Sequence, residues 1–241
     1  MFSALFHTLI YNPLYNGLVF LVGILPSHDV GLAVIALTIV VRVILYPLSR
    51  RAVDAQKKMK AIAPEIEELK KKYKTDREQQ GRAIFALYAE RGIHPFSGFL
   101  LVLVQLPILF ALYFVFARGG LPQVDVARLY AFVSEPRAVN MEFVGLVDMA
   151  GRSMVLAVLA AATQFVYTRL SMGSPRAHDN IEASFSSDMA RSFDIQARYV
   201  LPAMVGVFAY FIAAAAPLYW ITSNLFMIGQ EYLAGRRFRA T

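Results

Sequence analysis

The sequence contains no cysteine and little charge. None of its 241 residues is Cys, and only 17% are Asp, Glu, Lys or Arg, whereas a soluble domain usually carries about 25%. The lack of cysteine excludes disulfides, thiolate metal sites and cysteine nucleophiles. The low charge accompanies 57% hydrophobic residues and a positive mean hydropathy. This composition is typical of a membrane protein.

The sequence also lacks the residue groupings that support catalysis or metal binding. Its four histidines, His7, His28, His94 and His178, are scattered without the spacing of metal ligands. Neither a G-x-S-x-G motif nor a phosphate-binding glycine loop occurs. The net charge of +7 fits a membrane protein with basic loops, and no nucleic-acid-binding motif accompanies it. We therefore expect no enzyme activity, no metal, no cofactor and no direct binding of nucleic acid.

Five apolar segments are long enough to cross a bilayer, because a hydrocarbon core of about 30 Å requires about 20 residues in a helix. Helices are expected, since lipid offers no partner for unpaired backbone groups. A turn near Ala215–Pro217 must separate the last two segments, because one helix of their joint length would overshoot the membrane. The expected fold class is therefore all-α, a polytopic membrane protein with five transmembrane helices. The segments are Val30–Leu48, Phe96–Phe116, Ser153–Leu170, Tyr199–Ala216 and Pro217–Leu233.

The first 28 residues show a less regular pattern. Apolar residues at 2, 5, 6, 9 and 10 have the spacing of an amphipathic helix, which Asn12, Pro13, Asn16 and Gly17 then interrupt. The next apolar piece, Leu18–Leu25, is too short to span. We interpret residues 1–28 as an amphipathic region lying in the membrane interface. A sixth, poorly formed span is the alternative.

Lys and Arg residues are distributed unequally between the two sides of the five predicted spans. Nineteen of the 24 fall on one side and four on the other, and Arg42 lies within a span. Cytoplasmic loops of membrane proteins carry the excess of basic residues. The N-terminus is therefore expected outside and the C-terminus in the cytoplasm.

Arg42 lies inside the first apolar segment, where nothing can neutralise its charge. Arginine stays protonated in proteins, and a charge at membrane depth costs about 3 kcal/mol or more. The side chain could snorkel to the nearer interface, since it lies roughly 9 Å from the Leu48 end of the segment. The interpretation we favour is that Arg42 faces a wet cavity or an incoming anion.

Other polar residues lie within the predicted spans. Thr38 is one helical turn before Arg42 and shares its face. Taken singly, each such residue is expected to make a hydrogen bond between helices. Together, Thr38, Arg42, Gln105 and Asn224 could line one polar hollow. Glu231, near the end of the fifth segment, is a weak candidate partner for Arg42. The remaining polar residues are Thr163, Gln164, Thr222, Ser223 and Gln230.

Ser49–Pro95 is the single large polar insertion, and its pattern predicts a helical hairpin. Apolar residues step by three and four residues along the first arm, as in a coiled-coil seam. The turn is expected near Lys74–Asp76, and Pro64 should kink the first arm or shift its start. Its basic faces could be solvated surface, or could contact anionic lipid, a ribosome or another partner. The seam residues are Met59, Ile62, Ile66, Leu69 and Tyr73, and the candidate contact residues are Lys57, Lys58, Lys70, Lys71 and Lys72.

Three strings in this order resemble the YidC/Oxa-type membrane protein insertases, in a minimal five-span bacterial form. They are GLAVIALTIVVRVILYPLSRRAVDAQKKMKAIAPEIEELKKKYK, LYAERGIHPFSGFLLVLVQLPILFALY and LYWITSNLFMIGQ. The resemblance implies a plasma-membrane protein with a five-helix core, an interfacial helix before it and a cytoplasmic hairpin. It also implies a hydrophilic groove that is centred on Arg42 and lined by Thr38, Gln105, Trp220 and Asn224.

The same resemblance implies a function in the biogenesis of membrane proteins. Such a protein acts as insertase and chaperone, moving hydrophobic segments and short tails of nascent membrane proteins from the cytoplasm into the bilayer. The ribosome, the signal-recognition receptor, the Sec translocon and anionic lipids are further expected partners. The alternative is an anion-binding transporter or channel that uses Arg42 as its intramembrane charge. The expected regions are 1–28 (interfacial), 29–49 (first span), 50–95 (hairpin), 96–235 (remaining four spans) and 236–241 (basic tail).

Overall fold

A computed structural model describes residues 5–93, 97–117, 121–172, 195–233 and 235. The predicted basic tail, 236–241, lies outside the described residues. The chain forms two compact units. The first comprises Met1–Val43 and Pro107–Thr241, and the second comprises Ile44–Leu106.

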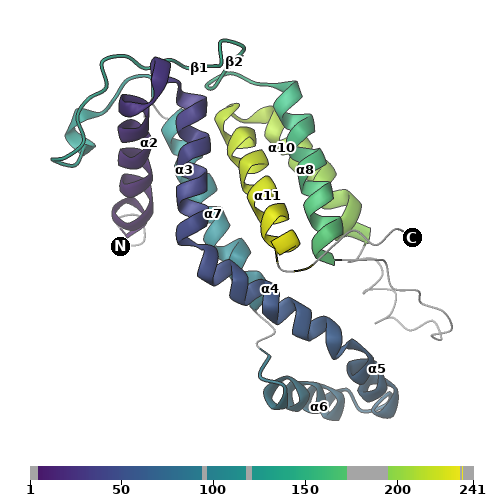
Figure 1. The fold of residues 1–241 in the computed structure, drawn as a ribbon. Coiled ribbons are helices and arrows are strands. Elements are labelled where there is room, and N and C mark those ends of the chain that lie inside the picture. The colour runs from purple at the N-terminus through teal and green to yellow at the C-terminus, as the bar shows by residue number, and fades with distance from the viewer. Residues whose placement is uncertain (1–4, 94–96, 118–120, 173–194, 234, 236–241) are drawn as a thin grey trace. The chain divides into compact units, whose positions relative to one another are not determined.

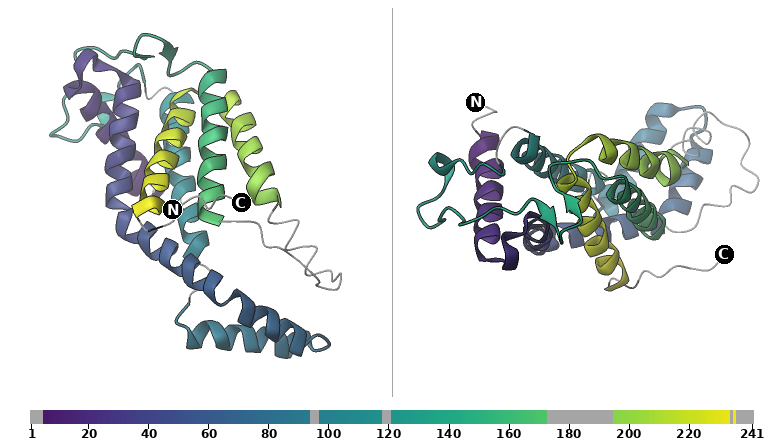
Figure 2. Two further views of the ribbon diagram at one scale, coloured as in Figure 1. Left: turned by 45° about the vertical axis from the view of Figure 1, so that its right-hand side comes forward. Right: turned by 90° about the horizontal axis from the view of Figure 1, so that it is seen from above.

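The first unit is built from helices joined by a long loop (Figure 1). A π-helical turn, His7–Tyr11, leads directly into α2. Within this unit α8 packs against both α10 and α11 (Figure 2). Its helices are α2 (Asn12–Ile24), α3 (Val30–Ile44), α7 (Ser97–Ala117) from Pro107 onward, α8 (Met154–Met172), α10 (Leu201–Phe211) and α11 (Ala215–Leu233).

Each of the five predicted spans corresponds to a helix, and the protein is mostly helical as expected. Of the described helices, however, only α8 is long and apolar enough to cross a bilayer by itself. A second candidate is α3 taken together with the start of α4, across the break at Leu45. Length and composition therefore do not confirm five spanning helices.

Two predicted boundaries differ from the structure. The first apolar helix ends at Ile44 instead of Leu48, and Pro47 lies in the first turn of the next helix, where a missing N–H is tolerated. The turn between α10 and α11 lies at residues 212–214, earlier than expected. The amides of Ala214 and Ala215 donate to the carbonyl oxygens of Gly151 and Met149, at 2.8 and 3.1 Å, which holds the turn there.

Large apolar side chains cover much of the outside of the first unit. On α8, Val155 and Val158 are exposed, and on α10, Val207 and Phe208 are exposed. The contact between these two helices instead uses small residues, since a Cβ on Gly206 would lie 2.9 Å from the Cβ of Ala161. Apolar outer faces and close contacts through small residues are typical of helices packed in lipid. The first unit therefore has the surface of a membrane-embedded bundle.

A long loop, 121–153, connects α7 to α8 and contains the short strands β1 (Glu142–Phe143) and β2 (Val147–Asp148). Asp29 ties this loop to α3, because one carboxylate oxygen accepts the Leu32 amide at 3.0 Å and the other accepts the Val144 amide at 2.8 Å. The first of these bonds caps the N-terminus of α3. A side chain at Gly31 would collide with the ring of Phe143, so the loop lies directly on the start of α3.

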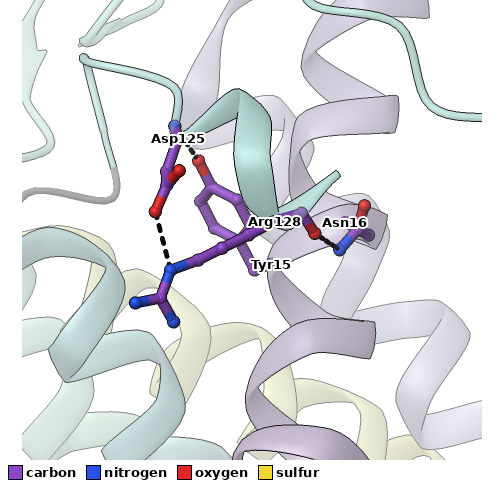
Figure 3. A network of polar contacts seen from close by, with 4 residues as sticks. All are labelled: Tyr15, Asn16, Asp125 and Arg128. Carbon is purple, nitrogen blue, oxygen red and sulfur yellow. Dashed lines mark hydrogen bonds and ion pairs between the residues drawn. The ribbon is translucent and has the colours of Figure 1, made fainter. Parts of the chain in front are cut away.

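The same loop is also tied to α2 (Figure 3). The Tyr15 phenol oxygen accepts the Asp125 amide at 2.7 Å, and Asn16 donates to the Arg128 carbonyl at 2.9 Å. Burial raises the pKa of the Tyr15 phenol above its ordinary value. We call Tyr15, Asn16 and Asp29, with the loop groups that they bind, the loop clamp.

The second unit contains the predicted hairpin. It comprises α4 (Tyr46–Ala61), α5 (Ala63–Lys72), α6 (Arg77–Glu90) and the start of α7. The first arm breaks at Ile62, two residues before Pro64, as expected from the missing N–H of proline. Asp76 caps α6 by accepting the Gln79 amide at 2.9 Å. A small apolar cluster joins the arms, formed by Ile62, Leu87 and Ile93 with Met59, Ile66, Leu69 and Tyr88 around them.

Candidate functional site

Arg42 is buried in the first unit, with 8% of its surface exposed. Its Nε donates a hydrogen bond of 3.2 Å to the hydroxyl of Ser223 on α11. α3 brings Arg42 to this position because its face of small and branched residues packs inward, whereas Val43 and Ile44 point outward. The charge predicted to be functional therefore lies between two helices rather than at their surface.

A second set of polar contacts joins α11 to α8. The indole of Trp220 donates to Gln164 Oε1 at 3.2 Å, and Gln164 Nε2 donates to the Thr168 hydroxyl at 3.2 Å. One turn further along α11, Asn224 donates to the Thr163 hydroxyl at 3.3 Å. Thr163 in turn donates to the Leu159 carbonyl of its own helix at 2.9 Å.

Ser223 and Asn224 are neighbours on α11 but face different helices. Consecutive residues of a helix point about 100° apart, so Ser223 reaches α3 while Asn224 reaches α8. α11 thus carries polar contacts from Arg42 on one side to α8 on the other. We call this group the polar belt; its members are Arg42, Thr163, Gln164, Thr168, Trp220, Ser223 and Asn224.

Hydrogen bonds between membrane helices contribute modestly, about 0.6 kcal/mol each on average. The cross-helix bonds of the belt are 3.2–3.3 Å long, at the long end of the usual range for N–H donors. Its groups are one guanidinium, amides, hydroxyls and an indole, which can bind an anion or a polar peptide, and none of its seven members is a base that would activate a hydroxyl. Among the described residues no cluster of His, Asp and Glu could hold a metal ion.

The structure brings together some of the predicted groove residues. Arg42, Trp220 and Asn224 all belong to the polar belt. Thr38 is buried one turn before Arg42, and its hydroxyl donates to the Val34 carbonyl of its own helix at 2.6 Å. Gln105 belongs to the second unit, so its predicted place in the groove is not tested.

Ser223 and Gln164 were expected only as contacts between helices, and both contact a predicted groove residue directly. The signal in the sequence was the run Thr222–Asn224, since polar neighbours on an apolar helix must face different partners. On the hairpin, Lys58, Lys70, Lys71 and Lys72 are exposed and Lys57 is partly exposed. Their predicted role as contact residues is not tested.

Comparison with known proteins identifies relatives over most of the chain. The model of a family described as 60Kd inner membrane protein matches residues 21–241. A protein of Clostridium tetani named Membrane protein insertase YidC is 34% identical over 209 residues, which cover 86% of this chain and 82% of that protein. A protein of Fusobacterium nucleatum with the same name is 32% identical over 225 residues, covering 92% and 95%.

Proposed function

Because this chain belongs to the 60Kd inner membrane protein family, we propose that it is a membrane protein insertase and chaperone. It moves hydrophobic segments and short translocated tails of nascent membrane proteins from the cytoplasm into the bilayer. The observation that carries this proposal is the buried polar belt inside a bundle whose outer faces are apolar. A surface of this kind suits lipid, and an interior of this kind suits a polar substrate.

In the proposed mechanism, a polar tail of the substrate crosses a shorter distance of water-free hydrocarbon. Crossing lipid is costly because charges and backbone groups lose their water. A hydrophilic groove centred on Arg42, and lined by Thr38, Gln105, Trp220 and Asn224, would receive the tail part of the way across. Arg42 attracts an acidic residue of the tail, and the attraction is stronger in surroundings of low dielectric constant. The apolar segment of the substrate then moves sideways into lipid. The favourable partitioning of this segment into lipid drives the transfer.

The polar belt supports this mechanism because its bonds can be exchanged. Each cross-helix bond joins two side chains at 3.2–3.3 Å, so a substrate group can replace one partner at low cost. Side chains can rotate away without disturbing the backbone of either helix. The belt thus offers donors and acceptors to a polar tail while the helices keep their packing.

We further propose five spanning helices in the bacterial plasma membrane, with the N-terminus outside and the C-terminus in the cytoplasm. The hairpin would then present its basic residues to anionic lipids, a ribosome, the signal-recognition receptor or the Sec translocon. Single cysteines at Ser3 and Ala240 should react with impermeant reagents from opposite sides. Reaction from the same side would instead favour a sixth span, an alternative supported by α2 folding back on α3, where Gly17 lies against Leu37.

The function is tested by inserting two substrates that differ only in acidic residues of the translocated tail. We expect Arg42→Ala to impair insertion of the acidic tail far more than the neutral one, because only the acidic tail loses an ion pair. Arg42→Lys should rescue in part, since it keeps the charge but loses the planar fork. Equal insertion of both tails at the wild-type rate would contradict the role of Arg42. Anion flux through reconstituted protein that Arg42→Ala abolishes would instead favour a transporter.

A further inference from the structure

Asn16 is a polar residue on a face of α2 that is otherwise apolar and exposed. Pro13, Phe20 and Ile24 share this face by helical spacing and are exposed, whereas Asn16 is 2% exposed. Asn16 is covered because the loop lies over it, with the Arg128 carbonyl and the Tyr130 amide bonded to its side chain. The loop therefore runs along the outward-facing side of α2.

Backbone hydrogen bonds fix the loop in this position. The Asn16 amide nitrogen donates to the carbonyl oxygens of Asn12 and Arg128, each at 2.9 Å. Its amide oxygen accepts the Tyr130 N–H at 2.6 Å, so every strong bonding group of this side chain is used on the helix or the loop. The Asp125 amide is held by Tyr15, and the Arg128 side chain donates to the Asp125 carboxylate at 2.7 Å (Figure 3).

After this segment, the loop follows α2 toward its C-terminal end, where α3 begins. Pro136 lies next to Gly23, since a Cβ there would be 3.9 Å from the Pro136 Cβ. Asn140 pairs with the backbone around Asp29, where α3 begins. From Asn16 to Gly23 the helix rises about 10 Å. The segment Val126–Phe132 therefore lies beside the N-terminal half of α2, between the levels of Pro13 and Phe20, rather than beyond the end of the helix where α3 begins.

This segment exposes large apolar side chains. Val126 is 56% exposed, Tyr130 37% and Phe132 76%, whereas the next residue, Val133, is buried against the protein. The rings of Tyr130 and Phe132 lie 5.6 Å apart and form one aromatic patch. Aromatic and apolar side chains beside polar backbone are characteristic of the membrane interface, where one side is wet and the other apolar.

We propose that Val126–Phe132 is an interfacial anchor that inserts Val126, Tyr130 and Phe132 into the boundary between lipid head groups and acyl chains. The occupant is phospholipid because the segment lies on the face of α2 that carries Phe20 and Ile24, which are exposed apolar residues, and exposed apolar helix faces of this kind suit lipid. Asn16 and Tyr15 hold the anchor, so the loop fixes the depth of α2 in the leaflet. The proposal rests on membrane location alone and not on insertase activity.

The absence of cysteine allows a direct test on the full-length protein. Phe132→Cys and Ala138→Cys are each labelled with the environment-sensitive dye NBD and reconstituted into phosphatidylcholine–phosphatidylglycerol vesicles. Ala138 is the matched control, because it is exposed on the same loop between the residues that contact Gly23 and the start of α3. We expect blue-shifted emission, and quenching by lipids brominated near the head of the acyl chain, at 132 but not at 138.

Three results would overturn the anchor. Emission at 132 that iodide quenches from water as readily as at 138 means that the segment is solvated. Protection of 132 from both iodide and brominated lipid means that protein covers it, as a partner or a second copy would. Equal quenching by brominated lipid at both positions means that the whole loop is submerged. An Asn16→Leu variant, which makes the helix face uniformly apolar and removes the two bonds to the loop, should reduce the brominated-lipid quenching at 132.

Discussion

The polar belt and the loop clamp are both buried and polar, but they bond in different ways. In the clamp, Tyr15, Asn16 and Asp29 bind backbone groups of a distant loop at 2.6–2.9 Å. In the belt, side chains bind side chains across helices at 3.2–3.3 Å. Opening a clamp bond leaves a backbone N–H or C=O of the loop without its partner, which costs about 1–3 kcal/mol where the group is buried, whereas the two side chains of a belt bond can both turn to a substrate. The clamp is therefore suited to stability and the belt to exchange with a substrate.

Asp29→Ala should have the largest effect on stability. The variant removes the cap of α3 and leaves the Val144 amide without its acceptor, a loss of about 2 kcal/mol. We expect a lower Tm in detergent and a similar fractional loss of insertion for acidic and neutral tails. Asp29→Asn keeps one acceptor oxygen, so its Tm should fall less than that of Asp29→Ala. A normal Tm with a selective loss of acidic-tail insertion would place Asp29 in the function instead.

Gln164→Leu should have a smaller effect on stability, below about 1 kcal/mol, because belt bonds contribute little. It removes the acceptor of the Trp220 indole. Trp220 is the only tryptophan, so its emission and anisotropy report this change directly. We expect a more mobile indole in Gln164→Leu and an almost normal one in Gln164→Glu, which keeps an acceptor.

Thr163→Val is the matched control for that experiment. It removes the acceptor of Asn224 and leaves the bond of Trp220 in place. Its Trp220 emission should therefore match the wild type. If Gln164→Leu lowers the Tm as much as Asp29→Ala does, the belt stabilises the fold as strongly as the clamp. The proposed difference in stability between the two sets of bonds would then be wrong.

The sequence predicted the belt better than it predicted the clamp. Long apolar runs place α3, α7, α8 and α11 within a few residues, and polar residues in such runs must find partners in neighbouring helices. Asn16, by contrast, only interrupted an amphipathic pattern, because its partners Arg128 and Tyr130 lie 112 and 114 residues away. The turn before α11 was misplaced for the same reason, since it is held by backbone groups near residue 150.

Trp220 illustrates what periodicity alone could not supply. Its place in a groove followed from the family resemblance, and its actual partner, Gln164, lies 56 residues earlier. Ser223 and Asn224 were visible as polar residues of one helix, but the sequence did not reveal which faces α3 and which faces α8. Which residue faces which helix depends on how α3, α8 and α11 pack together. This packing is decided by contacts between residues far apart in the sequence.

The most direct test of the polar belt as a substrate site is disulfide capture of a nascent chain. Ser223→Cys changes one atom beside Arg42, and Leu225→Cys lies two residues away on the exposed face of α11. A stalled substrate carries its own cysteine in an acidic translocated tail. We expect a disulfide with residue 223 and little or none with residue 225. Capture at 225 but not at 223, or equal capture at both, would contradict it.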